Sequence, residues 1–212
     1  MSRLVHFCLH GPTCSGKGYV TNHLKGRYRR LWVIGLGDMI RSRQGCDPDF
    51  QSYTEELTRL GRLISDEVVT EMVQQRYHEG VESGYTTFLW EGYGRNELQM
   101  RQQMQWWDGC EGRVFNLIAK KSTVIENLRQ AIAEGRRKDR GDNAAISDRY
   151  DLHQDKMEEV ARAVREGGRY LTQIDANQPL EQMARRIALF ANAVRSFREN
   201  EVFPGTAQLV AA

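Results

Sequence analysis

Short apolar segments alternate along this chain with longer segments in which apolar residues recur at helical spacing. Strands inside a parallel sheet are buried on both faces, so short continuous apolar runs predict such strands. Because helical segments separate these runs throughout, we expect a parallel five-stranded sheet covered by helices on both faces, a three-layer α/β fold. The predicted strands are residues 4–9, 31–34, 86–90, 112–118 and 170–174.

The segments between these strands have the spacing of amphipathic helices, and capping residues, glycine or proline mark their ends. Asp38 is expected to cap a helix that begins with Met39. The segment GCDP at 45–48 is expected to break that helix, with helical spacing resuming at Gln51, and Gly80 and Gly84 are expected to end a later helix. The other expected helices are residues 17–25, 51–60, 65–77, 96–107, 121–134, 145–165 and 180–197.

The composition is that of a globular, water-soluble chain of 212 residues, with 40% hydrophobic and 27% charged residues. This length suits one domain, with or without inserts. The formal net charge of +2 gives no reason to expect a nucleic-acid or membrane partner. No signal peptide is evident, and no apolar run approaches the ~20 residues of a membrane span. Cys8, Cys14, Cys46 and Cys110 form no C-x-x-C pair, so we expect reduced thiols, a cytoplasmic location and no zinc site.

The stretch GPTCSGKG, from Gly11 to Gly18, fits the phosphate-loop pattern of a glycine, four residues, and then Gly-Lys. Glycines let the backbone wrap closely round an anion, and the N–H groups and the following helix N-terminus attract negative charge. Lys17 would add a full positive charge for the β- and γ-phosphates. A glycine-rich turn with a surface lysine is the alternative, but the strand before the loop and the helix after it favour a phosphate loop.

Further motifs follow in order: GDMIR at 37–41, GRLISDEV at 61–68, FLWEGYGR at 88–95 followed by Gln99, and IDANQP at 174–179. With the loop, they resemble the adenylate kinases and their nucleoside monophosphate kinase relatives. The corresponding family motifs are GxPGxGKGT, GDLLR, GxLVPDELV, FLIDGFPR followed by Gln, and VDGTKPV. Apart from the loop, each motif is weak alone, whereas the ordered set over about residues 4–195 is specific. Arginines resembling those around the family's lid are Arg136, Arg137, Arg140 and Arg149, with Asp142 among them.

This resemblance implies a single P-loop kinase domain over residues 1–212. Its core would comprise residues 1–37, 67–135 and 149–212. Residues 38–66 would form a monophosphate-binding arm and residues 136–148 a lid. Because this lid is short and has no cysteine, it resembles the short, zinc-free form of the family. The family default is a monomer.

The resemblance also implies reversible phosphoryl transfer from MgATP to a nucleoside monophosphate, with AMP favoured. Mg²⁺ would arrive with ATP and have no direct protein ligand, although Glu91 could order a Mg²⁺-bound water. The implied catalytic residues, which neutralise the transferring group, are Lys17, Arg95, Arg140, Arg149 and Arg136. The implied ATP-binding residues are Thr13, Cys14, Ser15, Gly16, Lys17, Gly18, Tyr19, Arg136 and Gln178.

For the acceptor, the resemblance implies that Arg41 and Arg95 grip the α-phosphate through bidentate hydrogen bonds. Gln99 would read the adenine edge, because its amide offers both a donor and an acceptor. Uracil reverses the exocyclic group from donor to acceptor, although an amide is able to turn over. The implied monophosphate-binding residues are Leu36, Arg41, Leu63, Ile64, Gly92, Arg95 and Gln99.

The chain departs from the family pattern at several of these positions. Leu36 and Tyr19 replace threonines, Glu91 replaces an aspartate, and Gly94 replaces a proline. An arginine expected before the lid falls at Ile132, where nearby Arg129 is a substitute of uncertain register. These departures leave two alternatives open: a kinase for UMP, CMP or another monophosphate, and a degenerate nucleotide-binding sensor or scaffold.

Overall fold

The computed structural model describes residues 4–59, 64–135 and 143–199, and its centre is one all-parallel sheet. The strand order is β2-β3-β1-β4-β5, so β1 lies in the middle between β3 and β4. The predicted five-stranded parallel α/β fold is therefore confirmed. The strands are β1 (Val5–His10), β2 (Leu31–Gly35), β3 (Thr87–Glu91), β4 (Glu111–Ile118) and β5 (Tyr170–Asp175).

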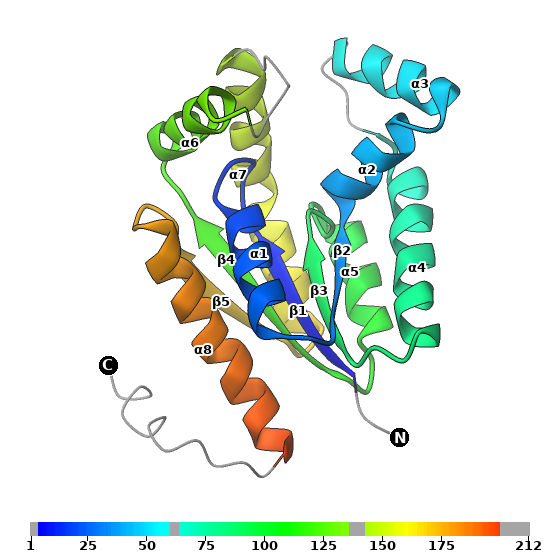
Figure 1. Ribbon diagram of the computed structural model, residues 1–212, viewed down its shortest axis with the longest axis vertical. Helices are drawn as coiled ribbons and strands as arrows, with labels where there is room; N and C mark the ends of the chain where they lie inside the picture. The colour runs from blue at the N-terminus through cyan, green and yellow to red at the C-terminus, as the bar shows by residue number, and fades with distance from the viewer. Residues whose placement is uncertain (1–3, 60–63, 136–142, 200–212) are drawn as a thin grey trace.

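Alternate side chains of β1 point into two separate hydrophobic cores, as the pleat of a strand requires. Phe7 and Leu9 pack in the core that contains residues of α1 (Lys17–Arg27) and α8 (Leu180–Glu199). Cys8 packs in the core that contains residues of α4 (Asp66–Glu82), α5 (Glu97–Trp106) and α7 (Asn143–Glu166). Helices thus cover both faces of the sheet, which explains why its strands are apolar throughout (Figure 1).

Three more helices lie toward the carboxyl ends of the strands (Figure 1). On one side, α2 (Leu36–Gln44) and α3 (Pro48–Arg59) extend beyond the sheet. On the other, α6 (Lys121–Ala133) lies beside the beginning of α7. In an open α/β sheet, ligands bind at these carboxyl ends, near the point where the strand order reverses. Within the described ranges, no helix has both the length and the apolarity to cross a membrane.

Three predicted helix boundaries were wrong. Helix α2 begins at Leu36, so Asp38 lies in its first turn and is not the cap. The segment at 45–48 does break the chain, since α2 ends at Gln44, but the next helix begins at Pro48 and not at Gln51, because the first turn of a helix needs no N–H from proline. The Asp47 carboxylate caps that turn by accepting a hydrogen bond from the Phe50 N–H at 2.9 Å.

Helix α4 continues through Gly80 to Glu82, although glycine there was expected to end it. The reason is close packing, since a Cβ atom added at Gly80 would lie 2.6 Å from the Trp32 ring and 2.8 Å from that of Phe88. Glycine is therefore kept inside the helix so that α4 can approach the sheet, despite its low helix propensity.

We predict opposite effects for two substitutions of helical glycines by alanine. Gly80→Ala should lower the free energy of unfolding by about 1–3 kcal/mol, because the new methyl group collides with two rings. Gly26→Ala in α1 is the matched control, since nothing lies within 4 Å of its added Cβ. It should leave stability unchanged or raise it by up to about 1 kcal/mol. Urea unfolding of both variants checks this, and equal effects would contradict the packing explanation.

Candidate functional site

The phosphate loop leaves the carboxyl end of β1 and ends where α1 begins, and two of its positions require glycine. Gly11 has φ +147°, and a Cβ atom there would lie 2.9 Å from the Leu117 Cβ. Gly16 has φ +92°, and its Cβ would lie 2.6 Å from Leu180 of α8. Both glycines of the motif are therefore required by backbone conformation, and Gly11 also by space, which allows the loop to pack between β4 and α8.

Lys17 folds back over this loop and is half-buried. Its ammonium donates to the carbonyl oxygens of Gly11 and Pro12, at 2.8 and 2.6 Å, and to the Ser15 hydroxyl at 3.4 Å. The ammonium therefore lies against the loop that the motif assigns to phosphates. The remaining expected ATP-binding residues of this segment adjoin it: Thr13 and Cys14 in the loop, and Gly18 and Tyr19 in the first turn of α1.

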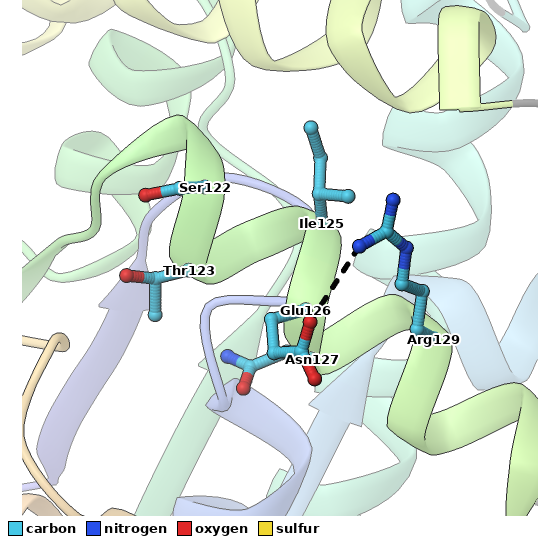
Figure 2. A pocket seen from close by; sticks show the side chains of 6 residues that line it. All are labelled: Ser122, Thr123, Ile125, Glu126, Asn127 and Arg129. Atoms are coloured by element: carbon cyan, nitrogen blue, oxygen red, sulfur yellow. Dashed lines mark ion pairs between the residues drawn. The ribbon is translucent and has the colours of Figure 1, made fainter.

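A groove of about 580 Å³ runs along α6 beside the loop (Figure 2). Asn127 connects the two, because its side-chain amide donates to the Cys14 carbonyl at 2.9 Å. Arg129 also lines the groove and pairs with Glu126 at 3.7 Å. Lys17 does not line this groove, so the expected phosphate site is identified by its charged side chains and not by the groove. Its lining residues are Ser122, Thr123, Ile125, Glu126, Asn127 and Arg129.

Glu91 is the last residue of β3, and Leu9 of β1 is its partner in the sheet. The Thr21 hydroxyl of α1 donates to its Oε2 at 2.6 Å, which fixes the orientation of the carboxylate. Carboxylate oxygens are hard ligands that suit Mg²⁺ or its bound waters. In the ranges that the structure describes, no group of three or more His, Cys, Asp or Glu could hold a metal ion.

The loop after β3 brings three expected acceptor-site residues together. A Cβ atom at Gly92, which has φ +83°, would lie 3.4 Å from the Arg95 guanidinium and 3.7 Å from the Leu36 Cβ. Arg95 Nε donates to the Gly92 carbonyl at 2.7 Å. Desolvation and the nearby Arg149 cation lower the pKa of Arg95, whereas Glu91 acts in the opposite direction. Arg95 is solvent-exposed, and it lies beside Gly92 and within reach of the charges of Arg149 and Glu91.

Some of the other predicted site residues lie on segments other than the Arg95 loop and the phosphate loop, and the structure does not describe others. Arg41 is exposed and pairs with Asp38 within α2, so its guanidinium is occupied. Ile64 packs against the core beside α4, and Gln178 is half-buried in the turn before α8. The positions of the remaining candidates lie outside the described residues: Leu63, Arg136, Arg137, Arg140 and Asp142.

Gln99 is 5% exposed, and both ends of its amide are engaged. Its Oε1 accepts from the Arg95 backbone N–H at 3.0 Å, and its Nε2 donates to the Asp66 carboxylate at 2.6 Å. The sequence predicted a residue that reads a base, but not these two partners. They come from the preceding loop and from the start of α4, and no local pattern signals the second pairing.

Sequence reasoning missed a histidine pair beside the phosphate loop. The rings of His10, the last residue of β1, and His153 of α7 have centroids 4.8 Å apart. His10 Nδ1 lies 3.4 Å from Asn116 Oδ1. Burial lowers the pKa of His10 to about 4 and that of His153 to about 3, and the Lys17 and Arg95 cations act in the same direction. Both imidazoles are therefore neutral at pH 7. The available signal was a histidine at the end of a strand in which His6 is the one other polar residue.

The pair predicts that stability falls in weak acid. The pKa of histidine in the unfolded chain is near 6.5, so below this pH the unfolded state binds protons that the folded state, with its lowered histidine pKa values, does not bind. Between pH 7 and pH 5, each histidine should contribute a loss of about 2 kcal/mol in the free energy of unfolding. His153→Phe should reduce this pH-dependent loss in urea unfolding. The exposed His78 is the matched control, and His78→Phe should leave it unchanged. An unaltered pH dependence in His153→Phe would contradict the assignment.

Comparison with known proteins adds independent information. No family model matches the chain. It is 26% identical over 190 residues to an adenylate kinase of Clavibacter michiganensis subsp. michiganensis, covering 87% of this chain and 92% of the relative. It is 25% identical over 183 residues to an adenylate kinase of Xanthomonas campestris pv. campestris, covering 84% and 94%. A similar protein of Phenylobacterium zucineum, also named adenylate kinase, is 26% identical over 129 residues. With the parallel sheet and its phosphate loop, these similarities support the assignment of this chain to the adenylate kinase family.

Proposed function

We propose that this protein reversibly transfers a phosphoryl group from MgATP to a nucleoside monophosphate, with AMP the favoured acceptor. The names of its relatives support a kinase, that is, a phosphotransferase. The observation that carries the proposal is the gathering of cations at the carboxyl ends of the central strands. Lys17 lies on the phosphate loop. Arg149 is close enough to Arg95 that its charge, together with desolvation as the larger cause, lowers the pKa of Arg95. Such a group of cations suits the polyphosphate of a nucleotide.

The transfer needs no covalent intermediate, because phosphoryl transfer depends on positioning and on stabilisation of charge. Lys17 would exchange the loop carbonyls for β- and γ-phosphate oxygens. Arg95 and Arg149 would neutralise the transferring group. Arg136 and Arg140, from the proposed lid at 136–148, would add charge and exclude water when that segment closes.

Mg²⁺ bound to the ATP phosphates would supply further charge neutralisation. Glu91 suits a role beside it, because Thr21 holds one carboxylate oxygen and leaves Oε1 to accept a hydrogen bond from a metal-bound water. Gly18 provides no hydroxyl ligand, although a side chain there would have space.

On the acceptor side, the proposed arm at 38–66 would contribute Arg41, which must leave Asp38 to bind the α-phosphate. Leu36 and Gly92 adjoin Arg95, and Gln99 lies one helical turn further along the chain. A buried amide that meets a base discriminates by leaving the wrong partner unpaired. This supports AMP, whereas Leu36, which has no hydrogen-bonding group, keeps UMP or CMP as the second candidate. A cytoplasmic monomer completes the proposal.

Lys17→Met tests the proposal. We expect turnover with ATP and AMP to fall by roughly 100-fold or more, because a preorganised charge on the transferring group is lost. A coupled assay of ADP formation measures this. The substitution should leave a folded protein, since Lys17 is only half-buried, and urea unfolding verifies that.

Lys25→Met is the matched control, because Lys25 is an exposed lysine in the last turn of the same helix. It should retain wild-type turnover. Near-normal turnover in folded Lys17→Met protein would overturn the proposed phosphate site.

A further inference from the structure

The amide of Gln99 is held by two partners of opposite hydrogen-bonding character. The Arg95 backbone N–H only donates, and it donates to Oε1 at 3.0 Å. The Asp66 carboxylate accepts from Nε2 at 2.6 Å. These residues come from the loop after β3 and from the first turn of α4, and the Gln99 side chain between them is buried.

Asp66 is itself held in place. Its Oδ2 accepts from the Asn96 side-chain amide at 2.9 Å, while its Oδ1 accepts from Gln99. Asn96 is also the cap of α5, because its Oδ1 accepts from the Gln99 backbone N–H at 2.9 Å. Asp66 begins α4, where the positive end of the helix dipole favours a carboxylate. The carboxylate is therefore oriented by two side-chain amides at the start of α5 before any ligand binds.

This arrangement prevents the Gln99 amide from turning over. A reversed amide would place Oε1 against the Asp66 carboxylate and the NH₂ group against the Arg95 N–H. Both hydrogen bonds would be lost, and each would be replaced by a contact between like partners in a buried site. The penalty is that of two unsatisfied buried groups, so one amide orientation dominates.

One lone pair of Oε1 and one N–H of Nε2 remain available, since an amide can make four hydrogen bonds and two are used. With the amide fixed, their order is fixed as well. Adenine and cytosine present an exocyclic N–H donor beside a ring acceptor. Uracil and guanine present an exocyclic oxygen beside a ring N–H, which is the reverse order and requires the reversed amide.

We propose that Asp66 is a positioning residue for base selection, which holds the Gln99 amide in the orientation that accepts an amino base and rejects an oxo base. This inference rests on the proposed function, because it takes Gln99 to face the acceptor base. Asp66 acts through Gln99 and makes no contact with the nucleotide. This positioning gives a physical reason for preferring an amino base, which the apolar side chain of Leu36 cannot give.

The test compares binding of AMP and UMP by titration calorimetry in wild type and Asp66→Asn. An asparagine can present either an oxygen or an NH₂ group to Gln99, so only the Arg95 N–H still opposes reversal of the amide. We expect the ratio of Kd for UMP to Kd for AMP to fall by about 3- to 10-fold, the equivalent of about one hydrogen bond. Asp66→Ser, which removes the carboxylate without adding an amide, should lower the ratio as well.

Glu67→Gln is the matched control, because it removes the same charge one residue along α4 from an exposed side chain. It should keep the wild-type ratio. An unchanged ratio in folded Asp66→Asn and Asp66→Ser, or an equal fall in Glu67→Gln, would overturn the inference.

Turnover of the same wild-type sample with ATP separates the two proposals. Binding needs no transfer, so a wild type that transfers nothing while Asp66→Asn lowers the Kd ratio contradicts the kinase and supports the positioning role. A wild type that transfers phosphoryl groups while the ratio never changes contradicts the positioning role alone.

Discussion

The close approach of the phosphate loop to its neighbours is the constraint on which the candidate site depends. Gly11 lies against Leu117 of β4 at a distance that excludes a side chain, and Gly16, whose positive φ favours glycine, lies against the side-chain ends of Leu180 and Met183 of α8. This packing places the end of β1 and the start of α1 at the middle of the sheet. Lys17 is consequently held over the loop, where its ammonium donates to the Gly11 and Pro12 carbonyls. A larger residue at Gly11 or Gly16 would move the loop away from β4 or α8.

The second feature of the site is an excess of positively charged side chains beside two neutral histidines. Arg149 and Glu91 both act on the pKa of Arg95, and Lys17 and Arg95 both act on the pKa values of His10 and His153. Beside them, His10 and His153 remain uncharged because burial and the cations both oppose protonation. A polyanion entering this region would relieve repulsion that the folded protein otherwise retains. Under the proposed function, these side chains would thus already be arranged to bind phosphate groups.

The strands and the phosphate loop could be predicted from sequence because their causes are local. A strand buried on both faces is apolar throughout, and the loop needs glycines at two fixed positions. Helix starts were less certain, since the same Pro48 either breaks a helix or begins one. Gly80 inside α4 is explained only by its packing against Trp32, which is distant in sequence, and against Phe88 of the next strand.

The partners of the site residues could not be predicted, for the same reason. Thr21 meets Glu91, Asp66 meets Gln99, and His10 meets His153 only through the fold. The resemblance identified Glu91 and Gln99 as candidates, yet their orientation depends on side chains from other elements. In the proposed roles, the orientation of the Glu91 carboxylate decides which oxygen is left for a metal-bound water, and the orientation of the Gln99 amide decides which base it accepts.

Phosphoryl transfer to each of several acceptors tests the central claim most directly. Purified protein is incubated with MgATP and either AMP, CMP or UMP, and formation of each diphosphate is followed at several acceptor concentrations. Transfer to AMP should exceed transfer to UMP in kcat/KM by roughly 10- to 100-fold, the range of about one unpaired buried group. Faster transfer to UMP would contradict the adenine assignment. Tight binding of ATP and AMP without any transfer would contradict the kinase itself and favour a nucleotide-binding sensor.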